Sequence, residues 1–284
     1  LLVFHVVIGK TVSDISVNAV ANLGYAEFRW GVPVFPGDTL SVLGPIGRGF
    51  EVHPERPRPL LVGGGVTWAF YAEGYDDMAA ANQQGKCPPA PADCGFGVGI
   101  YPCVYDPSDI PFQYYSAFRD NPVYMRDLRR LTTDLEGGTL PALSYVKALG
   151  YKSEHPGADT TIADGTRWVS GLVEQILGSQ YGERTLILLV YDEGGGYFDH
   201  VAPPPTSSVD GEPYGTRVPF LAIGPFARRN HIAHTTLEHS SIVKFIEWNW
   251  LGQETGQLGN RDVTANNLGS LLDPEQTGTA VPER

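Results

Sequence analysis

Residues 185–200 read TLILLVYDEGGGYFDH, and this stretch decides the expected fold. Residues 185–191 are short and continuously apolar, as expected of a central strand in a parallel sheet that is covered on both faces. Two acids and three glycines follow directly. In open α/β sheets, ligands bind in the loops beyond the carboxyl ends of the strands. The stretch therefore predicts a buried strand that ends in a functional loop.

Segments with strand and helix patterns alternate around this strand. The other strand candidates are residues 66–71, 143–146 and 218–223, of which the last repeats the apolar pattern of the central strand. The helix candidates begin at Asn121-Pro122, Asp164 and His239, and Gly137-Gly138 is the expected stop of the first. This alternation predicts an α/β fold in which a mostly parallel sheet has helices on both faces.

Composition and charge restrict the class of protein. The chain has 284 residues with 42% hydrophobic content, enough for a sizeable core. Its 34 glycines and 23 prolines indicate many turns and structured loops, which suit an enzyme more than a helical bundle. Residues 1–65 carry five basic and five acidic residues, so the whole net charge of −12 lies in residues 66–284. Such an acidic body argues against nucleic-acid binding and is compatible with cation binding. For most of these charges, a solvated surface that aids solubility is the favoured interpretation.

The three cysteines, Cys87, Cys94 and Cys103, lie in one Pro/Gly-rich segment. An odd number cannot pair completely, so one local disulfide in an extracytoplasmic or secreted protein is the favoured interpretation, and three free thiols are the alternative. No run approaches the roughly 18 apolar residues that a transmembrane segment requires.

The acids of the central stretch are candidate metal ligands. Asp192 and Glu193 offer the carboxylate oxygens that hard divalent cations favour, and the glycines after them let the backbone turn sharply. Asp199 and His200 follow in the same loop. The alternative is a strand-ending turn whose acids cap a helix or face water, but the position after a fully apolar strand favours a site.

Histidines elsewhere in the chain add candidates. His155 lies in the sequence SEHPG, a predicted loop between a strand and a helix, from which it can reach the same edge of the sheet. His239 stands at the start of a predicted helix, where anions such as phosphate bind, so it is a candidate substrate-binding residue together with Asp199. His231 and His234 are expected to be exposed loop residues.

Several blocks, taken together, resemble the phosphoesterase family of bacterial phospholipases C and acid phosphatases, which is related in fold to alkaline phosphatase. The matching blocks, over residues 66–284, are VTWAFYAEG, GGTLPALSYVK, EHPGAD, TLILLVYDEGGGYFDHVAPP, GTRVPFLAIGPFARR and LEHSSIVKFIEWNW. The resemblance implies hydrolysis of a phosphate ester, either a phospholipid or a small phosphomonoester, with a divalent metal ion. It implies that Asp192 and Glu193 serve the metal and that His155 contacts the metal or the phosphoryl group. His200 would be a further catalytic residue.

The amino-terminal segment departs from this family. Members begin with a Glu-Asn-x-Ser-Phe-Asp type block and carry a serine or threonine nucleophile, and residues 1–65 contain neither. SVLGPIGRG is faintly similar to the nucleophile loop, but Ile46 stands in place of the hydroxyl residue. Thr39, Ser41 and Thr67 are the nearest hydroxyl candidates.

Residues 1–65 resemble other proteins. Residues 1–41, with PVFPGDTL as the specific element, are similar to mesaconyl-CoA hydratases of the hot-dog fold. Residues 42–65, with LLVGGG, are similar to electron-transfer subunits of dihydroorotate dehydrogenase. The chain therefore looks composite, with an atypical segment over residues 1–65 and a phosphoesterase-like α/β domain over residues 66–284.

The sequence is compatible with three functions. The leading hypothesis is a metal-dependent phosphoesterase, impaired if no hydroxyl nucleophile is available. The second is a non-catalytic scaffold that has the same fold and binds a metal or an anion without turnover. The third, a CoA-thioester hydratase, depends on residues 1–41 alone.

Overall fold

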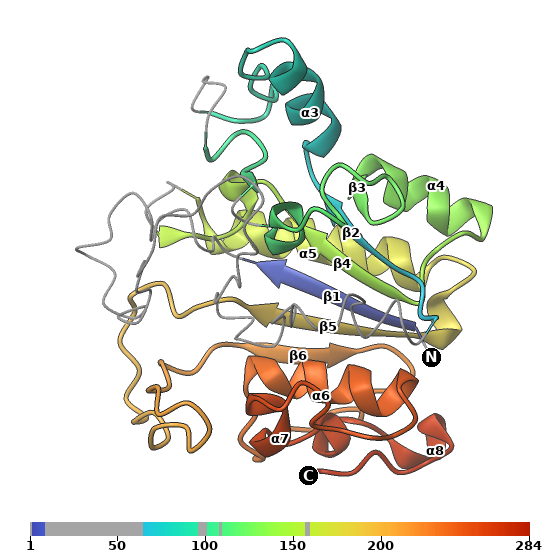
Figure 1. Cartoon of the computed structure of the whole chain (residues 1–284), viewed down its shortest axis with the longest axis vertical. Helices are drawn as coiled ribbons and strands as arrows, with labels where there is room; N and C mark the ends of the chain where they lie inside the picture. Colours follow the sequence, from blue (N-terminus) through green and yellow to red (C-terminus); the bar gives the residue numbers. More distant parts are fainter. Residues whose placement is uncertain (1, 9–64, 96–100, 108–109, 157–159) are drawn as a thin grey trace.

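The computed structural model describes residues 2–8, 65–95, 101–107, 110–156 and 160–284. Its centre is a six-stranded sheet with the strand order β3-β2-β4-β1-β5-β6 (Figure 1). The strands are β1 (Leu2–Ile8), β2 (Trp68–Ala72), β3 (Met125–Asp127), β4 (Leu143–Lys147), β5 (Thr185–Tyr191) and β6 (Phe220–Ile223). All neighbours pair in parallel except β5 and β6. The mostly parallel α/β sheet is therefore confirmed.

Helices cover both faces of this sheet (Figure 1). The helices of the described residues are α3 (Tyr75–Gln83), α4 (Arg129–Gly137), α5 (Ile162–Leu177), α6 (His239–Trp250), α7 (Arg261–Thr264) and α8 (Pro274–Thr277). The buried side chains form two clusters, one on each face. One cluster joins aromatic residues of β2 to Phe245 of α6, and the other joins Tyr71 to Leu131 of α4 and Ile176 of α5. No described helix is long and apolar enough to cross a bilayer.

β1 brings part of the amino-terminal segment into the middle of the sheet. It pairs in parallel with β4 on one side and with β5 on the other, so that Val3 is level with both Leu143 and Leu186. The sheet is thus not built from residues 66–284 alone. Whether residue 65 is a domain boundary stays a prediction, since residues 9–64 lie outside the described part of the chain.

β5 is the buried strand that its sequence predicts. Six consecutive residues from Thr185 to Val190 are buried, because the strand has a neighbour on each side and helices above and below. β6 differs from expectation. Residues 220–223 form the strand that was expected within residues 218–223. The strand is antiparallel, lies at the edge of the described sheet and is partly or fully exposed, so the expectation of a parallel strand covered on both faces is wrong. An apolar run does not reveal whether one or both of its edges will find a neighbour.

Two helix starts also differ from expectation. The helix expected from Asn121-Pro122 begins only at Arg129, because residues 125–127 extend the sheet beside β2 as β3. Its end is as expected, at a glycine in the left-handed conformation, Gly138 with φ of 73°. α5 is capped by Thr161 rather than by Asp164. The Thr161 hydroxyl accepts a hydrogen bond from the Asp164 backbone N–H, which places Asp164 in the first turn.

One disulfide joins Cys94 to Cys103, and Cys87 is free and exposed. The structure thus contains the single local disulfide favoured by the sequence. It closes a short loop near the carboxyl edge of the sheet, since residues 101–105 lie against Gly74 and Gly150, which follow β2 and β4.

Candidate functional site

The predicted acids lie at the carboxyl edge of the sheet. Asp192 and Glu193 follow β5 directly, and the parallel arrangement brings the end of β4 to the same edge. Asp192 is 3% exposed, and its Oδ1 accepts a hydrogen bond of 3.0 Å from the Glu193 backbone N–H. The acids therefore occupy the position at which open α/β sheets bind ligands.

The glycine loop after these acids touches the loop that carries His155. Gly195 has a φ of 62°, and a Cβ atom added to it would lie 2.9 Å from Cγ of Pro156. A side chain at this position would collide with Pro156 and strain the backbone. The glycine thus permits a close approach between the Asp192 loop and the residue next to His155.

A second contact joins the same two loops. The hydroxyl of Tyr191, the last residue of β5, donates a hydrogen bond of 2.5 Å to Oε2 of Glu154. Neither residue was expected in the site. Tyr191 reads as the last apolar residue of a buried strand, and Glu154 as a loop charge, so no local signal distinguishes them. The bond joins residues 37 positions apart.

His239 also reaches this strand end. It is the first residue of α6, and its Nε2 donates a 2.9 Å hydrogen bond to the backbone carbonyl of Tyr191. Burial lowers the pKa of the His239 imidazole, which favours its neutral form. The neutral ring fixes the backbone just before Asp192. Its role in substrate binding stays a prediction.

Asp199 and His200 lie farther along the loop. Asp199 accepts two hydrogen bonds from the Arg217 guanidinium, of 2.7 and 2.9 Å. These bonds hold the pKa of the Asp199 carboxyl well below its usual range. The His200 side chain is 84% exposed, with Nδ1 3.8 Å from Asp199 Oδ1. The catalytic role of His200 and the substrate-binding role of Asp199 stay predictions. His231 and His234 are exposed, as expected.

Two threonines, Thr67 and Thr216, lie at different places relative to the acids. Thr67 comes before β2, and its hydroxyl accepts a 3.0 Å hydrogen bond from the Ala142 backbone N–H, just before β4. It therefore lies at the amino edge of the sheet, opposite Asp192, and its candidacy as nucleophile is wrong. Thr216, which sequence reasoning missed, lies against Gly194, where an added Cβ would overlap its hydroxyl. Thr39 and Ser41 lie outside the described residues.

Asp192 and Glu193 are the described residues that were predicted to bind a metal ion. Asp192 and Glu193 offer suitable oxygen donors, but within the described ranges no group of three His, Cys, Asp or Glu side chains converges to hold an ion. The acids thus fit a divalent cation in kind, without a complete set of ligands from this part of the chain. The metal ion stays a proposal.

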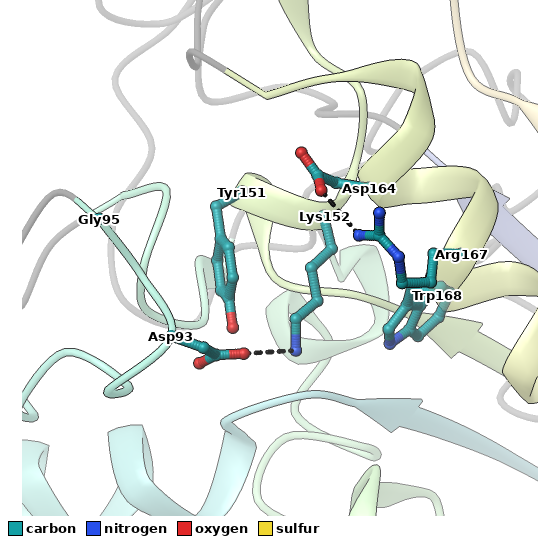
Figure 2. A pocket seen from close by; sticks show the side chains of 7 residues that line it. All are labelled: Asp93, Gly95, Tyr151, Lys152, Asp164, Arg167 and Trp168. Carbon is teal, nitrogen blue, oxygen red and sulfur yellow. Dashed lines mark hydrogen bonds and ion pairs between the residues drawn. The ribbon is translucent and has the colours of Figure 1, made fainter.

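A cavity of about 530 Å³ opens between the loop after β4 and the start of α5 (Figure 2). Its lining contains Asp93, Gly95, Tyr151, Lys152, Asp164, Arg167 and Trp168. Two ion pairs balance its charge, with Lys152 3.7 Å from Asp93 and Arg167 2.9 Å from Asp164. The cavity has the size of a small-molecule site. None of these lining residues is a predicted site residue, although Lys152 is three positions from His155.

The sequence also matches a known protein family. Residues 59–251, more than half of the chain, match the Phosphoesterase family. The chain therefore belongs to this family, and the resemblance drawn from the sequence blocks is confirmed.

Curated relatives point to the same family. The chain is 27% identical over 258 residues to the non-hemolytic phospholipase C of Pseudomonas aeruginosa, an alignment that covers 76% of this chain and 32% of the relative. It is 28% identical over 184 residues to phospholipase C B of Mycobacterium tuberculosis, covering 57% of this chain and 34% of the relative. The chain spans about a third of the length of these phospholipases C.

A different relative matches a short segment. The chain is 78% identical over 40 residues to the mesaconyl-CoA hydratase of Cereibacter sphaeroides, which covers 14% of this chain and 12% of that enzyme. This match supports the interpretation that the chain is composite. It is much closer in identity than the phospholipase C matches but covers far less of the chain.

Proposed function

We propose that this chain hydrolyses phosphate esters with the help of a divalent cation held by Asp192 and Glu193. Family membership supports phosphoester hydrolysis. The observation that carries the assignment to this site is the contact between Gly195 and Pro156, which brings the loop of the two acids against the loop of His155.

The chemistry follows from the groups at this edge. A bound cation would neutralise the phosphoryl oxygens and activate a hydroxyl or water. His155 is the proposed general acid that protonates the leaving alkoxide, and its position beside Pro156 keeps it near the glycine loop. His200, on the exposed side of the same loop, is the proposed second acid–base group. Asp199 and His239 are proposed to contact the substrate.

The proposed substrate is a phospholipid or a small phosphomonoester. The phospholipase C relatives favour the lipid, and the cavity beside the β4 loop offers space for the organic part of either ester. We further propose an extracytoplasmic or secreted location, because disulfides such as Cys94–Cys103 persist in oxidising compartments.

Hydrolysis assays test this proposal. The purified chain is incubated with p-nitrophenyl phosphate, bis-p-nitrophenyl phosphate and phosphatidylcholine vesicles, with and without a chelator. We expect turnover that the chelator removes and that Mg²⁺, Ca²⁺, Mn²⁺ or Zn²⁺ restores. Full turnover in the presence of the chelator would refute the requirement for a divalent cation. The preferred ester separates phosphatase from phospholipase activity.

A non-catalytic scaffold is the second candidate. It is favoured by the position of Thr67 at the opposite edge and by the incomplete ligand set among the described residues. Isothermal titration with the same cations distinguishes the candidates, since a scaffold would bind a cation through Asp192 but hydrolyse none of the esters. A CoA-thioester hydratase ranks third, because the match to such an enzyme covers only 14% of this chain.

A further inference from the structure

The hydrogen bond between Tyr191 and Glu154 links the two loops that carry the proposed chemistry. We propose that Glu154 is a positioning residue, which holds the His155 loop against the end of β5 through the Tyr191 hydroxyl. The effect of this contact on turnover rests on the proposed function. The structural contact itself can be tested without activity.

The bond is short and its direction is fixed. The Tyr191 hydroxyl lies 2.5 Å from Oε2 of Glu154, a distance typical of a hydroxyl that donates to a carboxylate. A carboxylate oxygen can only accept, so the tyrosine hydroxyl is the donor of this bond.

Glu154 is held in an unfavourable conformation. Its φ of 63° is left-handed, which costs a residue other than glycine about 1–2 kcal/mol. Its Oε1 is buried without a hydrogen-bond partner among the described residues, a second unfavourable feature. Such features persist where the surrounding contacts over-determine the conformation, and they gather at functional sites.

Gly165 of α5 is one of these surrounding contacts. The Glu154 side chain lies directly on this glycine, so that an added Cβ would overlap Cγ, Cδ and Oε1 of Glu154. The glutamate is thus enclosed between α5 on one side and Tyr191 on the other. It has little freedom to turn away from the strand.

The neighbours of the bonded pair explain its importance. Glu154 precedes His155, and Pro156 touches Gly195. Tyr191 precedes Asp192, and its carbonyl is held by His239. One hydrogen bond therefore fixes the backbone beside the proposed acid relative to the backbone beside the proposed metal ligand. Catalytic groups need this kind of support, because a misplacement of about 1 Å can cost roughly 100-fold in rate.

Steady-state kinetics test the catalytic consequence. Tyr191→Phe removes the hydroxyl and keeps the ring, whereas Glu154→Gln keeps an oxygen that accepts the bond. We expect Tyr191→Phe to lower kcat roughly 10–100-fold with little change in KM, as for loss of a supporting partner of a catalytic group. Glu154→Gln should retain most of the activity. Unchanged kcat in Tyr191→Phe would overturn the catalytic role.

Tyr71→Phe is the matched control. The Tyr71 hydroxyl donates a 2.7 Å hydrogen bond to the buried carboxylate of Asp134, so this variant loses the same kind of bond elsewhere on the sheet. It is expected to lower stability while kcat stays at the wild-type value. An equal fall of kcat in both variants would show a general structural effect and would contradict the proposal.

Hydrogen exchange tests the contact independently of turnover. Amides of residues 148–155 should exchange faster in Tyr191→Phe than in the wild type, and should be unchanged in Tyr71→Phe. Unchanged exchange in Tyr191→Phe would overturn the positioning role. If the wild type hydrolyses none of the esters, the proposed function fails, and exchange still decides whether Glu154 holds the loop.

Discussion

Two pairs of acids, far apart in the sequence, both include deeply buried carboxylates. Asp192 of the pair at the end of β5 is 3% exposed, and Glu247 and Asp262 of the carboxyl-terminal pair are 1% and 2% exposed. Burial alone thus does not separate a candidate site from a structural acid cluster. The difference lies in the backbone around each pair.

The carboxylates of the carboxyl-terminal pair are hydrogen-bonded to the backbone of a nearby loop. Its oxygens accept hydrogen bonds from four backbone N–H groups between α6 and α7, those of Gly256, Gln257, Leu258 and Asn260. This pattern ties the connecting loop to the core. Asp192 and Glu193 instead enter a glycine loop at the carboxyl edge of a mostly parallel sheet. An acid pair indicates a site when its position in the fold gives it access to a ligand.

The largest expected effect concerns the chemistry of the two pairs. Asp192→Asn should lower kcat/KM by more than the roughly 10–100-fold loss that follows removal of a supporting partner, because it removes charge from the proposed metal ligand itself. Glu247→Gln should leave kcat/KM near the wild-type value. Ester hydrolysis with saturating cation measures both. An active Asp192→Asn variant would remove the distinction between the pairs.

A smaller effect is expected at the helix beside the site. Gly165→Ala should destabilise the protein by about 1–3 kcal/mol, because its methyl group would displace Glu154 from its bond to Tyr191. Gly171→Ala, on the same helix, meets nothing within 4 Å and should stabilise by about 0.5–1 kcal/mol through helix propensity. Urea denaturation measures both. Stabilisation by both alanines would show that Glu154 is free to move.

The carboxyl-terminal pair should make stability depend on pH. Burial raises the pKa of Glu247 to about 7 from its ordinary value of 4.5, with the neighbouring Asp262 adding to the shift. A raised pKa means that folding favours the protonated acid. The contribution of Glu247 to the free energy of unfolding is therefore complete below about pH 4.5 and is lost as pH rises through 7.

Thermal denaturation from pH 4.5 to 8 measures this contribution. As pH rises, the wild-type Tm should fall because the Glu247 contribution is lost, by about 2–4 °C for each kcal/mol of stability. Glu247→Gln, which cannot ionise, should lack this fall. The same slope in both proteins would show that Glu247 does not titrate in this range.

The smallest effect is expected at Asp199, an acid of the site loop whose partner Arg217 is 59% exposed. Its lowered pKa means that the ion pair stabilises the fold above the ordinary Asp pKa and is lost as pH falls. Solvent screens such pairs, so Asp199→Asn should change Tm less than the preceding variants, and high salt should erase the difference. A large fall in Tm would give this pair a structural role.

The sequence by itself determined the parts of this protein that depend on local pattern. The apolar run of β5 predicted a buried strand, and the acids after it lie at the carboxyl edge of the sheet as that strand requires. The end of α4 at Gly137-Gly138 was also readable, because a glycine adopts the left-handed conformation that often ends a helix, as Gly138 does here. These features need no knowledge of distant residues.

Only the tertiary structure decided the features that depend on partners far along the chain. Residues 125–127 became a strand because β2 offered a pairing edge, and β6 became an antiparallel edge strand because β5 is its only neighbour among the described strands. Parallel pairing placed Thr67 at the edge opposite Asp192. The bond from Tyr191 to Glu154 depends on how β5 and the loop after β4 are brought together, and local pattern contains no information about such an approach.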